Sequence, residues 1–172
     1  MNVHETIKAR YSVRDYLSEP VSDEQLMKVL EAARLAPSSS NRQEWRFIVV
    51  RDESRRHRIA EAANHQTWIA TAPVIVAAIG TEPQSIMRCG LPRYAVDLSI
   101  AITHMMLAAV EEGLGTCWIG DFSQEKVREI LGVSPDCKVV TIMPLGHHTG
   151  TVPPTSSRKR LEDIVRYESD NR

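Results

Sequence analysis

The stretch YAVDLSIAITHMMLAAVEE, Tyr94 to Glu112, decides how the rest of the chain can fold. It is the longest candidate helix, it carries apolar residues on almost every face, and Gly113 follows it as a helix-ending residue. A helix that is apolar all round needs burial on all sides. We expect a central helix, covered partly by its own domain and partly by a second copy of the chain. The alternative is a helix buried wholly within one chain.

Shorter elements flank this helix on both sides. A capping-box pattern at Ser22 and Gln25 predicts a helix that runs through Ala33 and is stopped by Pro37. Further helices are predicted at 53–63, where we expect an exposed one, and at 123–132, and strands at 45–50, 73–79, 116–119 and 139–145. Because helices and strands interleave without a linker, we expect one layered α/β or α+β domain over residues 1–172.

Composition limits the possible partners. Lys plus Arg, at 21, nearly balance Asp plus Glu, at 22, so the net charge of −1 points to neither nucleic acid nor an anionic membrane. Polar residues from Asp97 onward also interrupt the apolar helix well before the roughly 18 apolar residues of a membrane span accumulate. The N-terminus lacks the apolar core of a signal peptide, and the three cysteines are odd in number and far apart, which suits a cytoplasmic protein. No CxxC pair exists, and the adjacent His147 and His148 would point to opposite faces of a strand, so we expect no metal site.

Two local clusters of positive charge stand far apart in the sequence. RYSVRDY, residues 10–16, places Arg10 and Arg14 around Ser12, and SRKR, residues 157–160, opens the C-terminal segment. Taken alone, these residues are more typical of a solvated basic turn and a solvated basic tail than of a ligand site. Any anion site must therefore be local and must draw on other residues.

Five segments, in this order, resemble the nitroreductase family of flavin-dependent oxidoreductases. They are RYSVR (10–14), APSSSNRQEW (36–45), QTWIATAP (66–73), EEGLGTCWIGDF (111–122) and PLGHH (144–148) followed by RKRLEDIV (158–165). Each motif alone is weak, but the ordered set covers nearly the whole chain. The resemblance implies an α+β, three-layer α/β/α domain with a central, mainly antiparallel sheet, which forms a homodimer.

The same resemblance implies that FMN binds at the dimer interface. Arg10, Ser12 and Arg14, with Arg158 from the tail, would hold its 5′-phosphate, whose oxygens guanidinium groups match with charge-assisted hydrogen bonds. A loop of short polar side chains would reach the flavin of the partner subunit, and Gln66 would lie near the ring. The residues of that loop are Pro37, Ser38, Ser39 and Asn41.

Next to the ring, the resemblance places Trp118 and Ile119 against its face and the Gly120 N–H near flavin N5. A glycine there lets the main chain approach a flat ring closely. The alternative for Trp118 is an aromatic residue buried for packing. This sequence departs from the family pattern at Glu44, where NxQPW is common, and at Ser156, where a lysine is common.

The implied reaction is hydride transfer from NADH or NADPH to FMN, followed by transfer from the flavin to a second substrate in the same pocket, a ping-pong scheme. Nitroaromatics, quinones and similar electrophiles are the acceptors of the family. Two rival functions stay open: a flavin enzyme of this fold with different chemistry, such as dehalogenation or flavin fragmentation, and a non-catalytic flavin-binding protein. The chain offers no GxGxxG motif and no catalytic triad that we can defend, so no side chain is assigned as nucleophile or general base.

Overall fold

A four-stranded antiparallel sheet forms the middle of the structure, a computed structural model that describes residues 1–150 and 158–170. The strands are β1 (Trp45–Val50), β2 (Val74–Gly80), β3 (Gly115–Thr116) and β4 (Lys138–Gly146). Their order across the sheet is β1-β2-β4-β3, and each neighbouring pair is antiparallel. The predicted strands at 45–50, 73–79 and 139–145 are confirmed within one residue at each end.

Both faces of this sheet are buried, as the uninterrupted apolar run of β2 requires. Alternate side chains of β2 enter two separate hydrophobic clusters, since successive residues of a strand point to opposite faces. One cluster receives Val74, Val76 and Ala78, and the other receives Ile75, Ala77 and Ile79.

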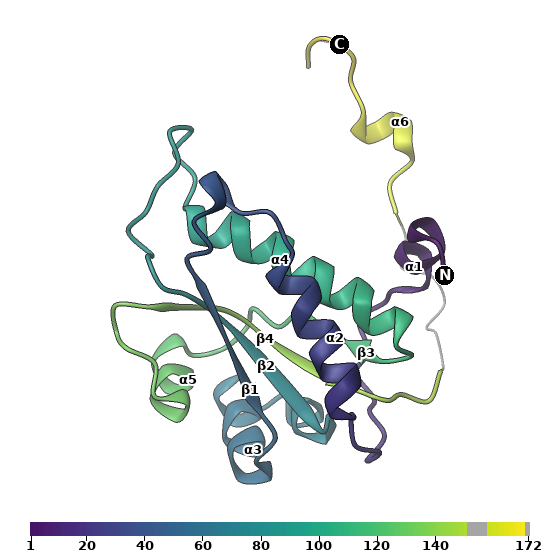
Figure 1. Ribbon diagram of the computed structural model, residues 1–172, viewed down its shortest axis with the longest axis vertical. Coiled ribbons are helices and arrows are strands. Elements are labelled where there is room, and N and C mark those ends of the chain that lie inside the picture. The colour runs from purple at the N-terminus through teal and green to yellow at the C-terminus, as the bar shows by residue number, and fades with distance from the viewer. Residues whose placement is uncertain (151–157, 171–172) are drawn as a thin grey trace.

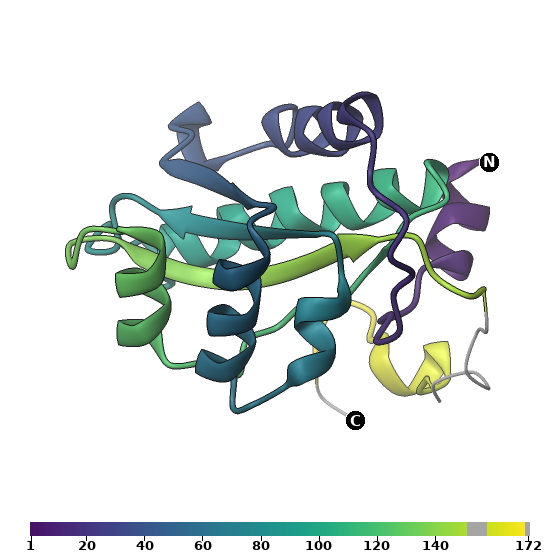
Figure 2. The ribbon, with the colours of Figure 1, turned by 90° about the horizontal axis from the view of Figure 1, so that it is seen from below.

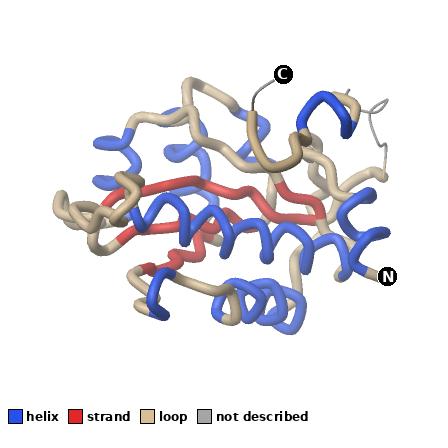
Figure 3. Tube along the Cα trace, turned by 90° about the horizontal axis from the view of Figure 1, so that it is seen from above, coloured by secondary structure: helices blue, strands red, loops and turns tan. Residues whose placement is uncertain are grey.

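Helices cover the two faces as separate layers (Figures 2 and 3). On one face lie α2 (Asp23–Arg34) and α4 (Arg93–Glu111), which pack against each other. On the other lie α3 (Glu53–Ala62), α5 (Gln124–Leu131) and the 3-10 helix η2 (Thr67–Thr71). The structure thus confirms an α+β fold of three layers around an antiparallel sheet.

The helix ends follow their sequence signals. Ser22 caps α2 through a complete capping box with Gln25, with hydrogen bonds of 3.1 and 3.2 Å. Gly113 follows α4 and has a φ of +73°. Its N–H donates to the Val110 carbonyl and the Leu114 N–H donates to the Ala109 carbonyl, the pair of bonds that closes many helices. Ser123 and Gly132 bound α5 in the same predicted roles.

Three sequence expectations need correction. The exposed helix at 53–63 is exposed on one side only, because Ile59 and Ala62 of α3 are buried against the sheet. The strand predicted at 116–119 is instead the two-residue strand Gly115–Thr116. The chain leaves the ladder at Cys117 and pairs with β4 again only through a bridge between Ile119 and Ile142. An additional helix, α1 (Val3–Ala9), precedes the first basic cluster and contacts α4.

The central helix and the tail both leave apolar side chains partly uncovered. By length and composition alone α4 could cross a membrane, but seven of its residues are buried, six of them in the hydrophobic cluster that α4 shares with α2 and the sheet. The tail carries a single helical turn, α6 (Leu161–Ile164), which projects from the body beyond α1 (Figure 1). Its apolar side chains Leu161 and Ile164 are 73% and 62% exposed.

Replacing Ile102 by alanine should lower the free energy of unfolding by about 2–5 kcal/mol, because its fully buried side chain in α4 would leave a cavity. Urea unfolding followed by circular dichroism measures the change. Met27→Ala in α2, where the side chain is 62% exposed, is the control and should change stability by less than about 0.5 kcal/mol. Equal losses in the two variants would contradict the assignment of Ile102 to the core.

Candidate functional site

The segment that contains the first basic cluster runs along the edge of the sheet, beside β3. The Val13 N–H donates to the Thr116 carbonyl over 2.9 Å, and Ser12 and Thr116 form a parallel bridge. Val13 is buried at 3% exposure. Because successive side chains of an extended segment point to opposite sides, the buried Val13 turns its neighbours Ser12 and Arg14 away from that core.

The buried phenol of Tyr16 anchors the end of this segment. Its hydroxyl donates toward two carbonyl oxygens, those of Val13 at 3.0 Å and Pro144 at 3.3 Å. The pKa of Tyr16 is raised well above its ordinary value, mainly by burial and next by the nearby Cys117. The phenol therefore stays a neutral donor. The segment is therefore fixed to the sheet before any ligand arrives.

Arg10, Ser12 and Arg14 gather around the buried thiol of Cys117. Burial raises the pKa of this thiol, whereas the charge of Arg14, a hydrogen bond with Ser12 and the charge of Arg10 lower it. Ser12 reaches the thiol through a hydrogen bond, and Arg10 and Arg14 act on it through their charges, so all three flank the same buried group. The structure thus brings together the three N-terminal residues predicted to hold a phosphate.

A second segment, at η2, joins this cluster. The Arg14 guanidinium carbon lies 5.8 Å from the centre of the Trp68 ring, within the range of a cation–π contact. Immediately before this short helix, the Gln66 side chain donates to the Asp121 carbonyl oxygen over 3.4 Å. Since Asp121 follows Gly120, Gln66 contacts the residue next to the predicted ring-binding Gly120.

The third segment, Cys117 to Asp121, passes between the two halves of the core. Trp118 is half-buried and packs against the cluster below α2 and α4. The Ile119 side chain is 5% exposed and packs in the opposite cluster, with its main chain paired to Ile142 at 3.1 and 3.2 Å. A contact of the Ile119 side chain with a flavin ring stays a prediction, and in this structure that side chain belongs to the core.

Gly120 is exposed, and the packing of the chain does not require a glycine there. A Cβ placed on Gly120 would meet nothing closer than Trp118 Nε1 at 3.7 Å. The space at this position is thus open toward solvent and would be restricted only by a molecule from outside the chain. This agrees with a glycine kept for the close approach of a flat ligand.

The predicted serine loop lies at the other end of α4. The main-chain N–H and hydroxyl of Ser39 both donate to Oδ1 of Asp97, at 3.0 and 2.8 Å. Ser38 accepts from the Gln43 N–H at 3.1 Å, and the Asn41 amide oxygen accepts from the Gln43 side chain at 3.2 Å. Pro37 leads into this loop, which contains the 3-10 helix η1 (Ser39–Asn41).

The helix α4 separates this loop from the cationic cluster within one chain. Asp97 lies in its second turn, and Glu111, its last residue, faces the N-terminal amino group at 3.7 Å. Fourteen residues of α-helix at 1.5 Å each set these points about 20 Å apart. The predicted site is therefore in two parts. Arg158 stands ahead of α6 on the exposed tail, and its contact with a phosphate stays a prediction.

Known proteins match this chain in sequence and in structure. The sequence model of the Nitroreductase family matches residues 7–73 and 61–147. A protein of Archaeoglobus fulgidus, provisionally named NADH dehydrogenase/NAD(P)H nitroreductase, is 34% identical over 147 residues, which cover 82% of each chain. The chain belongs to the nitroreductase family.

Two solved structures of the family share the fold. A nitroreductase family protein from Clostridium difficile 630 superposes with a TM-score of 0.88 and 32% identity, over 98% of this chain and 99% of that one. An NADPH:FMN oxidoreductase from Vibrio harveyi, solved in complex with NAD+, superposes with a TM-score of 0.88 and 27% identity. That match covers 98% of this chain and 78% of the Vibrio chain.

In this nitroreductase-family chain, a pair that the sequence did not assign fixes the cationic segment from its other side. The Tyr11 hydroxyl lies 3.0 Å from Nδ1 of His148, and the two rings meet edge to face at 5.6 Å. The Gly150 N–H also donates to the same nitrogen over 3.1 Å, which requires the tautomer with an unprotonated Nδ1, whose one lone pair the Tyr11 hydroxyl then shares. The motif PLGHH contained this histidine, but only its contact with Tyr11, 137 residues away in sequence, shows what it does.

Lowering the pH should loosen this pair. Burial, and next the nearby His147, lower the pKa of His148, so the unfolded chain binds more protons than the folded one below the usual histidine pKa. The resulting stability is present above about pH 6.5 and is lost as the pH falls through the lower folded pKa. Between pH 7.5 and 5.5 the melting temperature should fall more steeply in the wild type than in His148→Gln. Parallel profiles would show that His148 does not titrate with folding.

Proposed function

We propose that this chain is an FMN-dependent NAD(P)H oxidoreductase that works as a homodimer with two composite flavin sites. The observation that carries the proposal is the convergence of Arg10, Ser12 and Arg14 on Cys117, beside the surface formed by Gln66 and Gly120. The similarity to the Vibrio NADPH:FMN oxidoreductase supports the choice of FMN and a nicotinamide substrate. We also propose that residues 1–172 act as one domain and that the protein is cytoplasmic, which suits its three free cysteines.

The residues present fit the cofactor that this proposal requires. Arg10, Arg14 and the Ser12 hydroxyl would hold the phosphate, with Arg158 joining from the tail. Charge-assisted hydrogen bonds of this kind contribute about 1.5–3 kcal/mol each. When bound, FMN would supply the redox chemistry, and the protein would supply position, electrostatics and a face screened from water.

The open space at Gly120 fits the ring, and Gln66 lies next to it. We propose that the nicotinamide and the acceptor use this space in turn, which is a ping-pong scheme. A nitroaromatic, a quinone or a similar planar electrophile fits such a face. The half-buried Trp118 would form part of its wall.

The outer face of α4 supports the homodimer. It lines an open, mainly apolar groove of about 600 Å³, and a second groove of about 400 Å³ continues from it between α1 and α2, with His104 in both. Contiguous exposed apolar surfaces rimmed by polar residues are typical of interaction sites. In a twofold dimer through this face, the serine loop of one subunit can reach the cationic cluster of the other, which one chain cannot achieve alone.

The absorption spectrum of the freshly purified protein tests the function most simply. We expect oxidised flavin bands that disappear on anaerobic addition of NADH or NADPH. Protein that stays colourless after incubation with FMN and gel filtration would overturn the proposal. Protein that retains FMN but is bleached by neither nucleotide would instead be a non-catalytic flavin binder.

Arg14→Ala should raise the dissociation constant for FMN about ten-fold or more, because at least one charge-assisted hydrogen bond to the phosphate is lost. Fluorescence titration of the apoprotein with FMN measures the change. Arg55→Ala in α3 is the matched control, since Arg55 is exposed; Arg56 is unsuitable because it holds η2 through the carbonyls of Ala70 and Ala72. Equal affinities in the two variants would count against the phosphate assignment.

Ile100→Glu should split the dimer and release FMN together, because it places a charge on the apolar outer face of α4. Light scattering gives the mass, and the flavin content is read from the same column fraction. Ile130→Glu makes the same change at a half-buried position of α5, in the opposite layer, and should leave the mass unchanged. A monomeric Ile100→Glu protein that keeps FMN would show that the site is complete in one chain.

A further inference from the structure

Asp97 is the only charged residue between Arg93 and Glu111 in α4, and it is 3% exposed. A buried carboxylate without a cationic partner costs stability, and apolar side chains at such positions are often as stable or more so. Aspartate is also a poor residue for a helix interior. Packing of the core therefore gives no reason for an acid at this position.

The side-chain hydrogen bonds of Asp97 to the described residues go to a single residue of the serine loop. Its Oδ1 accepts from both the main-chain N–H and the hydroxyl of Ser39, at 3.0 and 2.8 Å. Its other oxygen, Oδ2, is buried and has no hydrogen-bond partner among the described residues. Both hydrogen bonds of Oδ1 thus go to Ser39, 58 residues earlier in the chain.

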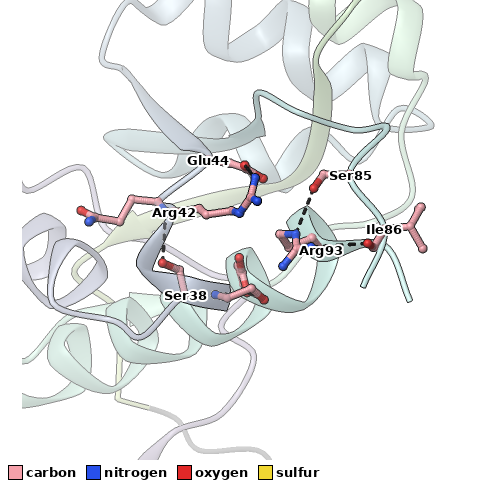
Figure 4. Close-up of polar contacts among 9 residues, drawn as sticks. Ser38, Arg42, Glu44, Ser85, Ile86 and Arg93 are labelled. Carbon is pink, nitrogen blue, oxygen red and sulfur yellow. Dashed lines mark hydrogen bonds and ion pairs between the residues drawn. The ribbon is translucent and has the colours of Figure 1, made fainter. Parts of the chain in front are cut away.

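The loop that Asp97 holds is strained. Ser40, Asn41 and Gln43 have φ angles of +52°, +53° and +55°, which residues other than glycine seldom adopt. Further contacts lie in the same region (Figure 4). Arg42 pairs with Glu44 at 3.0 Å, and the Arg93 side chain donates to the hydroxyl of Ser85, in the loop between β2 and α4. Backbone strain of this kind persists only where the surrounding structure over-determines it.

The bond to Asp97 also decides what Ser39 can offer a ligand. A serine hydroxyl has one hydrogen, and the bond to the carboxylate at 2.8 Å uses it in preference to the longer, weaker contact with Met87 Sδ at 3.6 Å. The lone pairs of the hydroxyl oxygen remain, so Ser39 presents an acceptor. A hydroxyl of the ribityl chain or the N–H of the flavin pyrimidine ring is a donor that matches it.

We propose that Asp97 is a positioning residue that fixes the serine loop and makes the Ser39 hydroxyl an acceptor for the flavin of the partner subunit. The proposal rests on the proposed function. It assigns to a buried acid of α4 the same task that Tyr16 and the Tyr11–His148 pair perform for the cationic cluster, which is to position a binding group before the ligand arrives.

The test measures FMN affinity and thermal stability in four variants of the full chain: Asp97→Ala, Asp97→Asn, Ser39→Ala and Asp97→Asn combined with Ser39→Ala. Asp97→Ala should raise the dissociation constant for FMN about ten-fold, and Asp97→Asn by less, because the amide oxygen can still accept from Ser39. Since Asp97 acts through Ser39, the double variant should bind FMN no more weakly than the weaker single variant. If Asp97→Ala does not fold, the isosteric Asp97→Asn carries the comparison.

Val127→Ala is the control for lost stability, because Val127 is fully buried in α5, away from the loop. It should lower the melting temperature and leave FMN affinity unchanged. Asp97 variants that behave in the same way, or effects of Asp97 and Ser39 that simply add, would overturn the proposal while leaving the function intact. Wild-type protein that binds no FMN would overturn both.

Discussion

The rigidity of α4 is the constraint on which the rest of the structure depends. One side of this helix is buried between α2 and the sheet, so its position cannot shift without disturbing the core. Its two ends carry the two halves of the candidate site, about 20 Å apart. A twofold axis across its outer face would reverse its direction and bring the Asp97 end of one helix to the Glu111 end of the other. In the proposed dimer, the length of this one helix is the reason why the site needs two subunits.

The charge of the site is local. With a net charge of −1 the chain creates no general attraction for anions, yet the charges of Arg10 and Arg14 both act on the thiol of Cys117, whose pKa they lower. Their segment is fixed by Tyr16 on one side and by the Tyr11–His148 pair on the other. Such preparation limits the ordering that binding requires, which lets a few charge-assisted bonds retain a ligand without a covalent link.

Regular elements with strong local signals were predictable. β1 matches its apolar, β-branched run residue for residue, and Ser22, Gly113 and Ser123 end or begin helices as their side chains or backbone freedom require. α1 was missed because it is short, although Asn2 and Glu5 form a capping box that could have revealed it. β3 is shorter than predicted because the apolar residues after Thr116 leave the ladder to line both halves of the core.

The site itself was only partly predictable. The ordered motifs identified Arg10, Ser12, Arg14 and the serine loop, but not the residues that position them. Asp97 could be noticed as a lone acid in an apolar helix, yet its partner Ser39 lies 58 residues away. Contacts of this kind depend on how α4 packs against the loop, and no local pattern encodes them.

The most direct test of the composite site is subunit complementation. Arg14→Ala damages the cationic half of the site, and Ser38→Ala with Ser39→Ala damages the loop half, so each homodimer should bind FMN weakly at both sites. In a heterodimer of the two variants, purified through two different tags, the account predicts one site with both changes and one with neither. Titration should then find about one FMN bound per dimer with wild-type affinity. Heterodimers in which no site recovers wild-type affinity would contradict it, because the two groups of residues would then belong to the same subunit.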